Sequence, residues 1–374
     1  MSELATGEQK NSRQVELNLY TGEEYFKAIT ADIAQTLPGD RIAITTFCFE
    51  PADRLVEPAF NELLAAADRG VDTAFGVDAY TFIIDYEAKS LGPLYLPLPF
   101  RQSSFKRRRT ALEELAAKPT AICTILNKTQ QLPQRLFKNP LAGRSHLKTA
   151  VINDKVYIGG PNFHRTDRLD MVVGLEDTET ADWLYGLTTR IIEAESTAAV
   201  LGDQDQTRQV DGTTQILIDA GAPGQSLILD EAYKVIDGAS THLYVPFQYF
   251  PDHETASHIA AAYSREVKVY PAYNHPAKNG IIVGFMQQRA VSRMRKILPP
   301  EFFEGELSRS APILHTKAIA SDRAAMVGAH NHANHGPKLG TAESELRSSD
   351  PNFARMVGQK ILKQIERYKE PIVS

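Results

Sequence analysis

Apolar and polar positions alternate along the chain in two rounds that follow the same order. Each round begins with a short apolar run typical of a strand, at residues 15–19 and again at 215–219. A helical stretch follows each run. In the first round, one helix face is marked by an apolar stripe, Phe26, Ile29, Ile33 and Leu37. Residues 232–236 repeat this stripe less regularly, so a second helix is predicted at the same point in the order.

Two more apolar runs in each round predict further strands. Residues 42–49 in the first round match 243–250 in the second, and residues 71–77 match 267–270. Strands that alternate with helices in this way form a sheet covered by helices on its faces. The pattern therefore predicts an α/β protein made of two repeated α/β/α sandwich halves, each with a mixed central sheet.

The boundary between the halves is predicted in the polar stretch at residues 202–209. The first half is then residues 15–202, and the second is residues 210–374. The first half is longer because it contains an insertion at about residues 86–145. We expect this insertion to carry substrate specificity.

Composition narrows the class of protein. The chain has 374 residues, of which 43% are hydrophobic, enough to bury two substantial cores. Cys48 and Cys123 are the only cysteines, which argues against a disulfide framework or a Cys-rich metal site. The net charge of −5 argues against a generally basic nucleic-acid binder. Residues 1–14 are polar, and no apolar run is long enough to cross a bilayer, so we expect a cytoplasmic protein without a signal peptide.

The most informative pattern is a short motif that occurs twice, 169 residues apart. The first copy begins with His146-x-Lys148, and the second begins with His315-x-Lys317. Each copy continues through a predicted hairpin and spans 17 residues from its His to an Asn. The closing residues are Gly159, Gly160 and Asn162 in the first copy and Gly328, Ala329 and Asn331 in the second.

These residue types suit chemistry at a phosphate group. Side chains at i and i+2 of a strand share a face, so each His is expected to project beside its Lys. The small residues let backbone and ligand approach closely, and each Asn supplies an amide donor. With two such halves face to face, one His can attack phosphorus while the other protonates the leaving oxygen. The Lys and Asn side chains can then stabilise charge on the non-bridging oxygens.

The repeated motif resembles that of the phospholipase D superfamily, which reads His-x-Lys-x4-Asp followed by Gly-Gly/Ser-x-Asn. The stretch "GTAESEL" and the later "DPNFARMV" are similar to the C-terminal ending of its cardiolipin synthase group. The resemblance implies an active site at the pseudo-two-fold interface of the halves and a phosphohistidine intermediate. It implies no metal and no other cofactor. By family analogy His146 is the nucleophile and His315 the general acid.

The Asp position of the motif differs between the two copies. The second copy has Asp322, whereas the first has Asn153 followed by Asp154. In the family this Asp is a supporting residue. Asn153 has two interpretations, either as turn chemistry in the hairpin or as a change that alters efficiency and substrate class.

Acidic residues downstream of each Asn are candidates for orienting the imidazoles. In relatives such an acid accepts a hydrogen bond from the His and fixes its tautomer. By position the candidates are Asp170 and Glu343, with Glu345 as the alternative to Glu343. A plain surface carboxylate is the other interpretation of each. The nearby His330, His332 and His335 have the look of a zinc site, but the chemistry needs no metal and we expect none there.

Surface features bear on the substrate. Residues 91–100 are apolar, aromatic and rich in Pro, which suits a buried connector or a loop that enters a lipid interface. Residues 106–109 form a dense basic run. A second basic group lies on a predicted helix, Arg289, Arg293, Arg295 and Lys296. Such groups are solvated helix faces, or they contact anionic lipid or a nucleic-acid backbone.

Three functional hypotheses stay open at this point. The first, which we favour, is a phospholipase D or a phosphatidyltransferase that acts on phospholipids and contacts an anionic membrane from its surface. The second is a nuclease of the same superfamily that cuts DNA or RNA. The third is a binding protein that keeps the fold without catalysis. We expect a monomer in each case.

Overall fold

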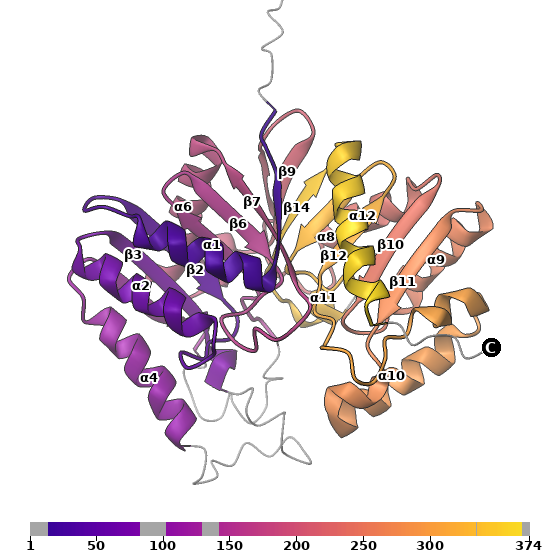
Figure 1. Ribbon diagram of the computed structural model, residues 1–374, viewed down its shortest axis with the longest axis horizontal. Coiled ribbons are helices and arrows are strands. Elements are labelled where there is room, and N and C mark those ends of the chain that lie inside the picture. Colours follow the sequence, from indigo (N-terminus) through magenta and orange to yellow (C-terminus); the bar gives the residue numbers. More distant parts are fainter. Residues whose placement is uncertain (1–13, 83–101, 129–141, 334, 369–374) are drawn as a thin grey trace, which may run out of the picture.

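The computed structural model describes residues 14–82, 102–128, 142–333 and 335–368. Within these residues the chain forms two halves, each built on a mixed sheet with helices on both faces (Figure 1). The predicted fold class, two repeated α/β/α sandwich halves, is confirmed.

The sheet of the first half has the strand order β1-β7-β6-β5-β2-β3-β4 among the described residues. β2, β3 and β4 run parallel to one another, and the other neighbours are antiparallel. Its strands are β1 (Asn18–Thr21), β2 (Arg41–Thr46), β3 (Asp72–Asp78), β4 (Ala121–Leu126), β5 (Thr149–Ile152), β6 (Lys155–Gly159) and β7 (Met171–Glu176).

The second sheet repeats this topology, with the order β11-β10-β12-β13-β14-β9-β8. In the direction from β9 to β11, the strands β9, β14, β13, β12, β10 and β11 of the second sheet correspond in order to β1, β7, β6, β5, β2 and β3 of the first sheet. β4 and β8 have no counterpart among the described strands and extend the two sheets at opposite edges. Its strands are β8 (Gln206–Gln209), β9 (Thr214–Asp219), β10 (His242–Phe247), β11 (Lys268–Tyr273), β12 (Ala318–Ser321), β13 (Ala325–Gly328) and β14 (Glu343–Ser348).

Strand β8 corrects the predicted linker. Residues 206–209 pair antiparallel with β9 and belong to the second sheet. Their side chains are polar because an edge strand bonds through its backbone and leaves its side chains in solvent. Polar composition alone therefore does not distinguish such a strand from a linker.

Helices cover the first sheet in two layers that follow the alternation of its strands. Ile42 and Ile44 of β2 pack with α1 (Gly22–Ala34) and α2 (Val56–Asp68). Ala43, between them in sequence, packs on the opposite face against Ile192 of α6 (Thr178–Glu193). The apolar stripe of α1 ends at Ile33, because Pro38 follows and Leu37 is 67% exposed beyond the helix.

The second sheet is covered in the same way. α8 (Leu227–Asp237) and α9 (His253–Ser264) share one apolar cluster with β10. α12 (Pro351–Glu366) packs on the opposite face. The other described α-helices are α4 (Gln102–Ala116), α7 (Thr197–Leu201), α10 (Gly280–Met294) and α11 (His335–Leu339). None of the helices in the described ranges is long and apolar enough to cross a bilayer.

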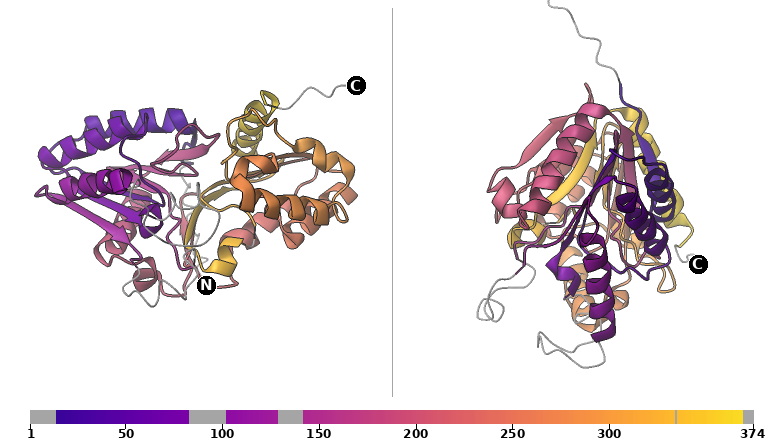
Figure 2. Two further views of the ribbon diagram at one scale, coloured as in Figure 1. Left: turned by 90° about the horizontal axis from the view of Figure 1, so that it is seen from below. Right: turned by 90° about the vertical axis from the view of Figure 1, so that its left-hand side faces the viewer.

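The two halves share one hydrophobic core along the line where they meet. Ile158 of β6 and Val173 of β7 belong to the same buried cluster as Ile216 of β9 and Val327 of β13. The strands of both halves converge at this line in two views (Figures 1 and 2). The halves are therefore packed against each other through apolar side chains, which holds their facing edges in a fixed relation.

The insertion of the first half contributes α4 and β4. β4 pairs parallel with β3, so it widens the sheet on the side away from the second half. The predicted apolar loop at residues 91–100 lies outside the described residues.

The basic run at residues 106–109 is largely engaged within the fold. It lies on α4, where Arg108 is 1% exposed and donates to the carbonyl of Thr81 at 2.6 Å and to Oε2 of Glu50 at 3.1 Å. Arg107 reaches Oε1 of Glu50 at 2.7 Å. Exposed Arg109 pairs with Glu113 one helical turn away. The run is therefore neither a wholly solvated helix face nor a continuous free basic surface.

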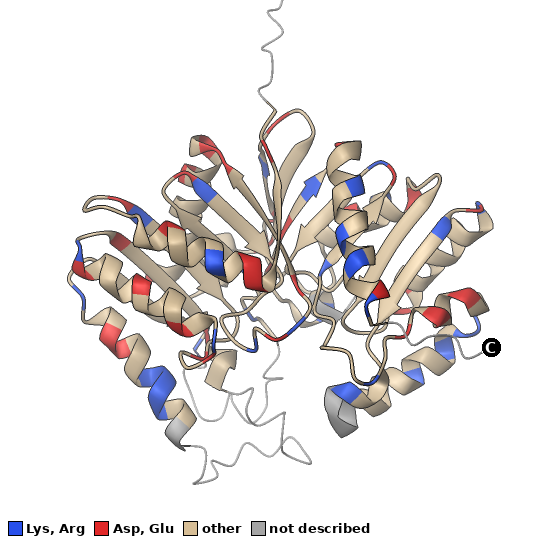
Figure 3. Cartoon of the chain, viewed as in Figure 1, with Lys and Arg blue, Asp and Glu red and all other residues tan. Residues whose placement is uncertain are grey.

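The second basic group is spread over two structural segments. α10 ends at Met294, so Arg289 and Arg293 lie on the helix while Arg295 and Lys296 follow it. The guanidinium of Arg295 sits 4.5 Å from the centre of the Phe303 ring. In the view of Figure 3, Lys and Arg alternate with Asp and Glu along several helices of both halves, whereas α10 shows basic positions only.

Loss of Arg108 should therefore weaken the fold, whereas loss of its exposed neighbour Lys106 should not. Arg108→Ala removes one partner of a buried ion pair, and we expect the free energy of unfolding to fall by about 3 kcal/mol. Arg107 still pairs with Glu50 in this variant. Lys106→Ala, the matched change on the same helix, should alter the free energy of unfolding by less than about 0.5 kcal/mol. Urea unfolding measures both. Equal effects would mean that the Arg108 pair adds nothing to the stability of the fold.

Candidate active site

The two motif histidines lie just before the strands predicted to hold them. β5 begins at Thr149 and β12 at Ala318, so each His and Lys belongs to the segment that enters the strand. These segments bond to the opposite half. The backbone NH of His146 donates to the carbonyl of Ala342 at 2.8 Å, and that of His315 donates to the carbonyl of Leu169 at 2.8 Å. Each motif is therefore held in place by the half that does not contain it.

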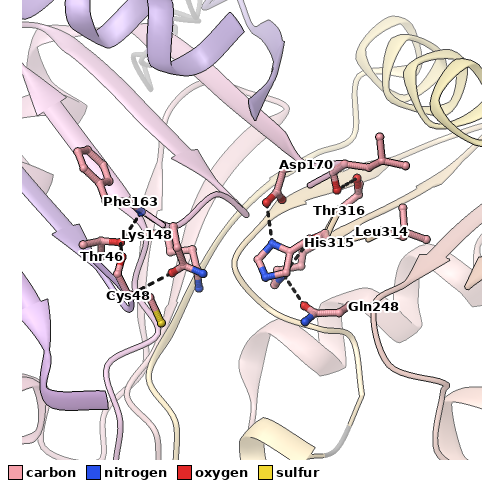
Figure 4. Close-up of polar contacts among 12 residues, drawn as sticks. Thr46, Cys48, Lys148, Phe163, Asp170, Gln248, Leu314, His315 and Thr316 are labelled. Atoms are coloured by element: carbon pink, nitrogen blue, oxygen red, sulfur yellow. Dashed lines mark hydrogen bonds and ion pairs between the residues drawn. The ribbon is translucent and has the colours of Figure 1, made fainter. Parts of the chain in front are cut away.

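The predicted orienting acids contact the predicted histidines across this junction. Nδ1 of His146 lies 2.6 Å from Oε2 of Glu343. Nδ1 of His315 lies 2.6 Å from Oδ2 of Asp170, the contact that Figure 4 shows. In each pair the His and the acid come from different halves. The alternative acid, Glu345, instead lies 3.0 Å from Nε2 of His332 and accepts from the backbone NH of His330.

Burial governs the ionisation of these pairs. It lowers the pKa of both imidazoles well below the usual value, and the neighbouring lysines lower it further. Burial also raises the pKa of Asp170 to about 7 and that of Glu343 well above its usual value. Each pair is therefore poised to share one proton, which an arriving charged group can shift between its members.

The motif lysines lie beside their histidines, but with different neighbours in the two halves. Nζ of Lys148 donates to the carbonyl of His146 at 3.2 Å and lies 5.7 Å from the centre of the Phe47 ring. Nζ of Lys317 donates to the carbonyl of His315 at 2.8 Å and to Oε1 of Gln248 at 2.9 Å. Burial lowers the pKa of Lys148 to about 8 and that of Lys317 well below its usual value. An anion placed between these lysines would raise the pKa of both.

Of the two motif asparagines near the junction, Asn162 is buried and Asn331 is half-buried. Oδ1 of Asn162 accepts from the backbone NH of Cys48 at 3.3 Å, so its amide NH2 is the end left to meet a ligand. Oδ1 of Asn331 is buried and has no hydrogen-bond partner among the described residues.

The small residues of the motif serve packing, which corrects the expectation that they admit a ligand. A Cβ on Gly159 would lie 2.6 Å from a methyl group of Val172, and one on Gly160 would lie 2.0 Å from Oδ1 of Asp170. A Cβ on Gly328 would lie 2.6 Å from Oε2 of Glu345. These positions lack side chains because the return strand passes so close to the next strand and its carboxylates.

The variable Asp position of the motif lies at the far end of the hairpin. Asn153 has a φ of 52°, and its Oδ1 accepts from the backbone NH of Arg41 at the start of β2. Asp322 accepts from the backbone NH groups of Ser240 and Thr241 just before β10. Asn153 and Asp322 thus accept hydrogen bonds from the backbone at the starts of two equivalent strands, β2 and β10. An amide oxygen accepts such a bond as a carboxylate does. Turn chemistry is therefore the interpretation of Asn153 that the geometry favours.

Two positioning residues were not predicted, Asp78 and Asn274. Oδ2 of Asp78, at the end of β3, accepts from the backbone NH of Ser145 at 2.9 Å. Oδ1 of Asn274, just after β11, accepts from the backbone NH of Leu314 at 2.8 Å. Each residue thus fixes the position immediately before a motif His. The sequence signal that could have found Asp78 and Asn274 is a single polar residue at the end of the corresponding apolar strand in each half.

An aromatic wall flanks His146, whereas a polar residue takes the equivalent place beside His315. The rings of Phe47 and Tyr80 stack with centres 4.5 Å apart, and Phe47 meets the His146 ring edge-on at 4.7 Å. In the second half the residue after β10 is Gln248, which bonds Lys317. The site therefore has an apolar side and a polar side.

The His-rich stretch packs into the core of the second half. The backbone NH of His332 donates to Nδ1 of His330, and Nε2 of His332 meets Glu345. The side chain of His335 lies outside the described ones. In the described ranges, no three of His, Cys, Asp and Glu are grouped as metal ligands would be.

A small pocket opens against His315 and Asp170. It contains about 230 Å³ of space, part of it open to solvent. Its wall is formed largely by the loop after β6, including Asn162, Arg165 and Arg168. The two arginines were not among the predicted site residues.

No family model matches the chain, and no curated protein sequence matches it. Solved structures do match its fold. The crystal structure of phosphatidylserine synthase from Haemophilus influenzae Rd KW20 matches with a TM-score of 0.66 at 15% identity, over 95% of this chain and 87% of that one. Polyphosphate kinase from Porphyromonas gingivalis matches with a TM-score of 0.52 at 12% identity, over 97% of this chain and 53% of that one.

A third match is a phospholipase D family member, Nuc from Salmonella typhimurium, with a TM-score of 0.31 at 14% identity over 48% of this chain and 94% of that one. The chain shares the fold of the phosphatidylserine synthase structure, with two repeated α/β/α halves.

The stability of the protein should depend on the ionisation of Asp170. Its pKa of about 7 in the fold lies above the 3.8 of a free aspartate, so folding favours the protonated form. Its contribution to the free energy of unfolding is fully present below about pH 4 and is lost as the pH rises through about 7. Asp170→Asn cannot ionise, so its stability relative to the unmodified protein should rise between about pH 5 and about pH 8.

Urea unfolding at the two pH values measures this shift, with the exposed Asp203→Asn as the control. A difference between Asp170→Asn and the unmodified protein that stays the same at both pH values would show that the Asp170 carboxyl does not titrate in this way.

Proposed function

We propose that this protein cleaves or exchanges the phosphodiester bond of phospholipids through a phosphohistidine intermediate, as a phospholipase D or a phosphatidyltransferase. The observation that carries the proposal is the pair of His–carboxylate contacts at the junction, His146 with Glu343 and His315 with Asp170, each at 2.6 Å. Each contact occupies Nδ1 and leaves Nε2 of the imidazole as the reacting nitrogen.

In the first step, Nε2 of His146 attacks phosphorus, and the bond from phosphorus to the leaving oxygen breaks. Nε2 of His315 donates its proton to that oxygen, so the leaving group departs as a neutral alcohol. Glu343 accepts from Nδ1 of His146, which keeps the lone pair on Nε2 and stabilises the positive charge formed on attack.

In the second step, His315 acts as the base. It takes the proton from water or from an acceptor alcohol, whose oxygen attacks phosphorus as the bond to Nε2 of His146 breaks. Water gives hydrolysis, and an alcohol gives transfer. His146 is regenerated, and His315 is again protonated for the next cycle.

The lysines and asparagines stabilise the phosphate during both steps. Lys148 and Lys317 are buried, so their ammonium groups act in a weakly screened environment, where charge stabilisation is strong. The amide groups of Asn162 and Asn331 add donors on the same phosphate. None of these steps requires a metal.

Three observations favour phospholipid over nucleic acid. The basic run of α4 is engaged by Glu50 and does not form an open track for a phosphate backbone. The stacked Phe47 and Tyr80 give His146 an apolar side that suits a lipid glycerol or acyl carbon. The matching structure with the higher TM-score is described as a phosphatidylserine synthase, which supports a phospholipid substrate here. We propose peripheral contact with an anionic membrane, so that the substrate enters from the bilayer surface.

The unmodified protein should be active on phospholipid, and the His315→Ala variant should lose this activity. Purified protein is assayed in EDTA on vesicles that contain anionic phospholipid and, separately, on a single-stranded oligonucleotide. We expect release of phosphatidic acid or head-group exchange from the vesicles, and a loss of at least about 10³-fold in His315→Ala. His242→Ala, an exposed His on β10, is the matched control. Cleavage of the oligonucleotide alone would support the nuclease hypothesis, and no turnover of either would support the binding protein.

Labelled phosphate should become attached to His146. The intermediate forms and is removed in separate steps, so rapid quenching of the unmodified protein during turnover should leave label on the protein. The label should be lost on mild acid treatment and retained in base, as expected of a phosphoramidate, and peptide mapping should locate it. His146→Ala should carry none. Label on His315 in place of His146 would reverse the two roles.

A further inference from the structure

We propose that Arg168, with Arg165, forms an anion subsite on the His315 side of the active site, which binds a second anionic group carried by the leaving group or by the acceptor alcohol. This inference rests on the proposed function and adds a substrate requirement to it. Neither arginine belongs to the repeated motif, so neither is accounted for by the chemistry at phosphorus.

The subsite is a formed pocket next to the reacting groups. Arg165, Arg168 and His164 line it together with His315 and Asp170. Arg168 is near enough to the lysines to lower the pKa of Lys148 and Lys317, besides that of His315. Its charge therefore acts on the same space as that of the motif lysines.

Arg168 has no partner of its own in the described part of the chain. It forms no ion pair there, and its Nε is buried without a hydrogen-bond partner. A buried donor that bonds neither protein nor water is costly. The Asp170 carboxylate lines the same pocket: His315 holds its Oδ2, while its Oδ1 has no hydrogen-bond partner among the described residues, and the charge of Arg168 lowers its pKa. An anion in the pocket would supply the missing acceptor.

The loop that carries the arginines is held in place from both ends. Thr166 donates through its backbone NH to Asp53 at 3.2 Å and through its hydroxyl at 2.5 Å. The backbone NH of Leu169, next to Arg168, donates to the carbonyl of Ile313 at 2.9 Å. The guanidinium groups are thus mounted on an anchored backbone, which lowers the entropic cost of binding.

Arg168 breaks the pseudo-symmetry of the site. Leu169 pairs with Leu314 before one His, and Ala342 pairs with Ser145 before the other. The position equivalent to Arg168 is therefore Thr341, which carries no charge. The phosphate under attack is stabilised by one Lys and one Asn from each half. A cation beside His315 alone is suited to an anionic group that lies on that side of phosphorus alone.

The proposed mechanism tells which group this is. His146 attacks on one side of phosphorus, so the leaving oxygen departs in line on the other side, where His315 protonates it. The acceptor later occupies the same place. The guanidinium fork of Arg binds carboxylate and phosphate oxygens in pairs. We therefore expect a leaving group or acceptor that bears its own phosphate or carboxylate.

Two series of substrates separate the sources of the anion. For the leaving group, a phospholipid that releases glycerol is compared with a diphosphate diester that releases a phosphate monoester. For the acceptor, glycerol is compared with glycerol phosphate and with lactate. In each series, the kcat/KM for the anionic compound is divided by the kcat/KM for the neutral one. We expect Arg168→Gln to lower this ratio by about 10- to 100-fold. Arg168→Lys should restore part of it, and Arg190→Gln, exposed on α6, should not change it.

An effect in one series only assigns the subsite to the leaving group or to the acceptor. An equal fall for neutral and anionic compounds in both series would overturn the subsite, because Arg168 would then act on the transferred phosphate or on Asp170. No change in either ratio would overturn it as well.

Binding provides a readout that does not depend on turnover. By calorimetry the unmodified protein should bind pyrophosphate more tightly than inorganic phosphate, and Arg168→Gln should lose that difference while Arg190→Gln keeps it. A protein that turns over no phosphodiester but shows this pattern would refute the proposed function and retain the subsite. A difference that survives in Arg168→Gln would refute the subsite, whatever the activity.

Discussion

Each imidazole of the repeated motif depends on a buried carboxylate that belongs to the other half of the molecule. His146 meets Glu343, and His315 meets Asp170, in a place where burial opposes any net charge. Such pairs are stable only if both partners stay in hydrogen-bond contact, since a buried charge without its partner is costly. The shared apolar core of the two sheets and the backbone bonds at Ala342 and Leu169 keep that contact. The apolar packing of the halves is thus a condition for the chemistry of the site.

Around this junction the two halves are alike in their framework and different in what they present to a ligand. Asp78 and Asn274 hold the residues before the two histidines in the same way, although one is an acid and the other an amide. Phe47 and Gln248 come after equivalent strands, yet one offers a ring and the other a hydrogen bond to Lys317. The likeness gives both motif histidines the same backbone support. The differences allow the two sides to receive different chemical groups.

Much of this could be predicted from local patterns. Alternation of strands and helices indicates the sandwich halves, and the repeated His, Lys and Asn mark the site. The acids could be predicted by position along the chain, but not which His each would meet, because spacing in sequence does not encode how two halves dock. Gly159 and Gly160 have the same sequence signature whether a ligand or a neighbouring strand approaches them. The basic run could not be recognised as engaged, since Glu50 lies 58 residues before Arg108. β8 escaped notice because an edge strand needs no apolar side chain.

The joining of both halves in one polypeptide has an evolutionary consequence. In a symmetric homodimer of identical halves, any substitution appears twice, so a cation introduced beside one histidine would also appear beside the other. A single chain removes this restriction, because each half is encoded separately. Arg168 opposite Thr341, and Phe47 opposite Gln248, are changes that only a fused molecule can hold on one side. In the proposed mechanism, fusion therefore permits a pseudo-symmetric centre to distinguish the group that stays on phosphorus from the group that leaves or enters, without any loss of the symmetry that the bond exchange requires.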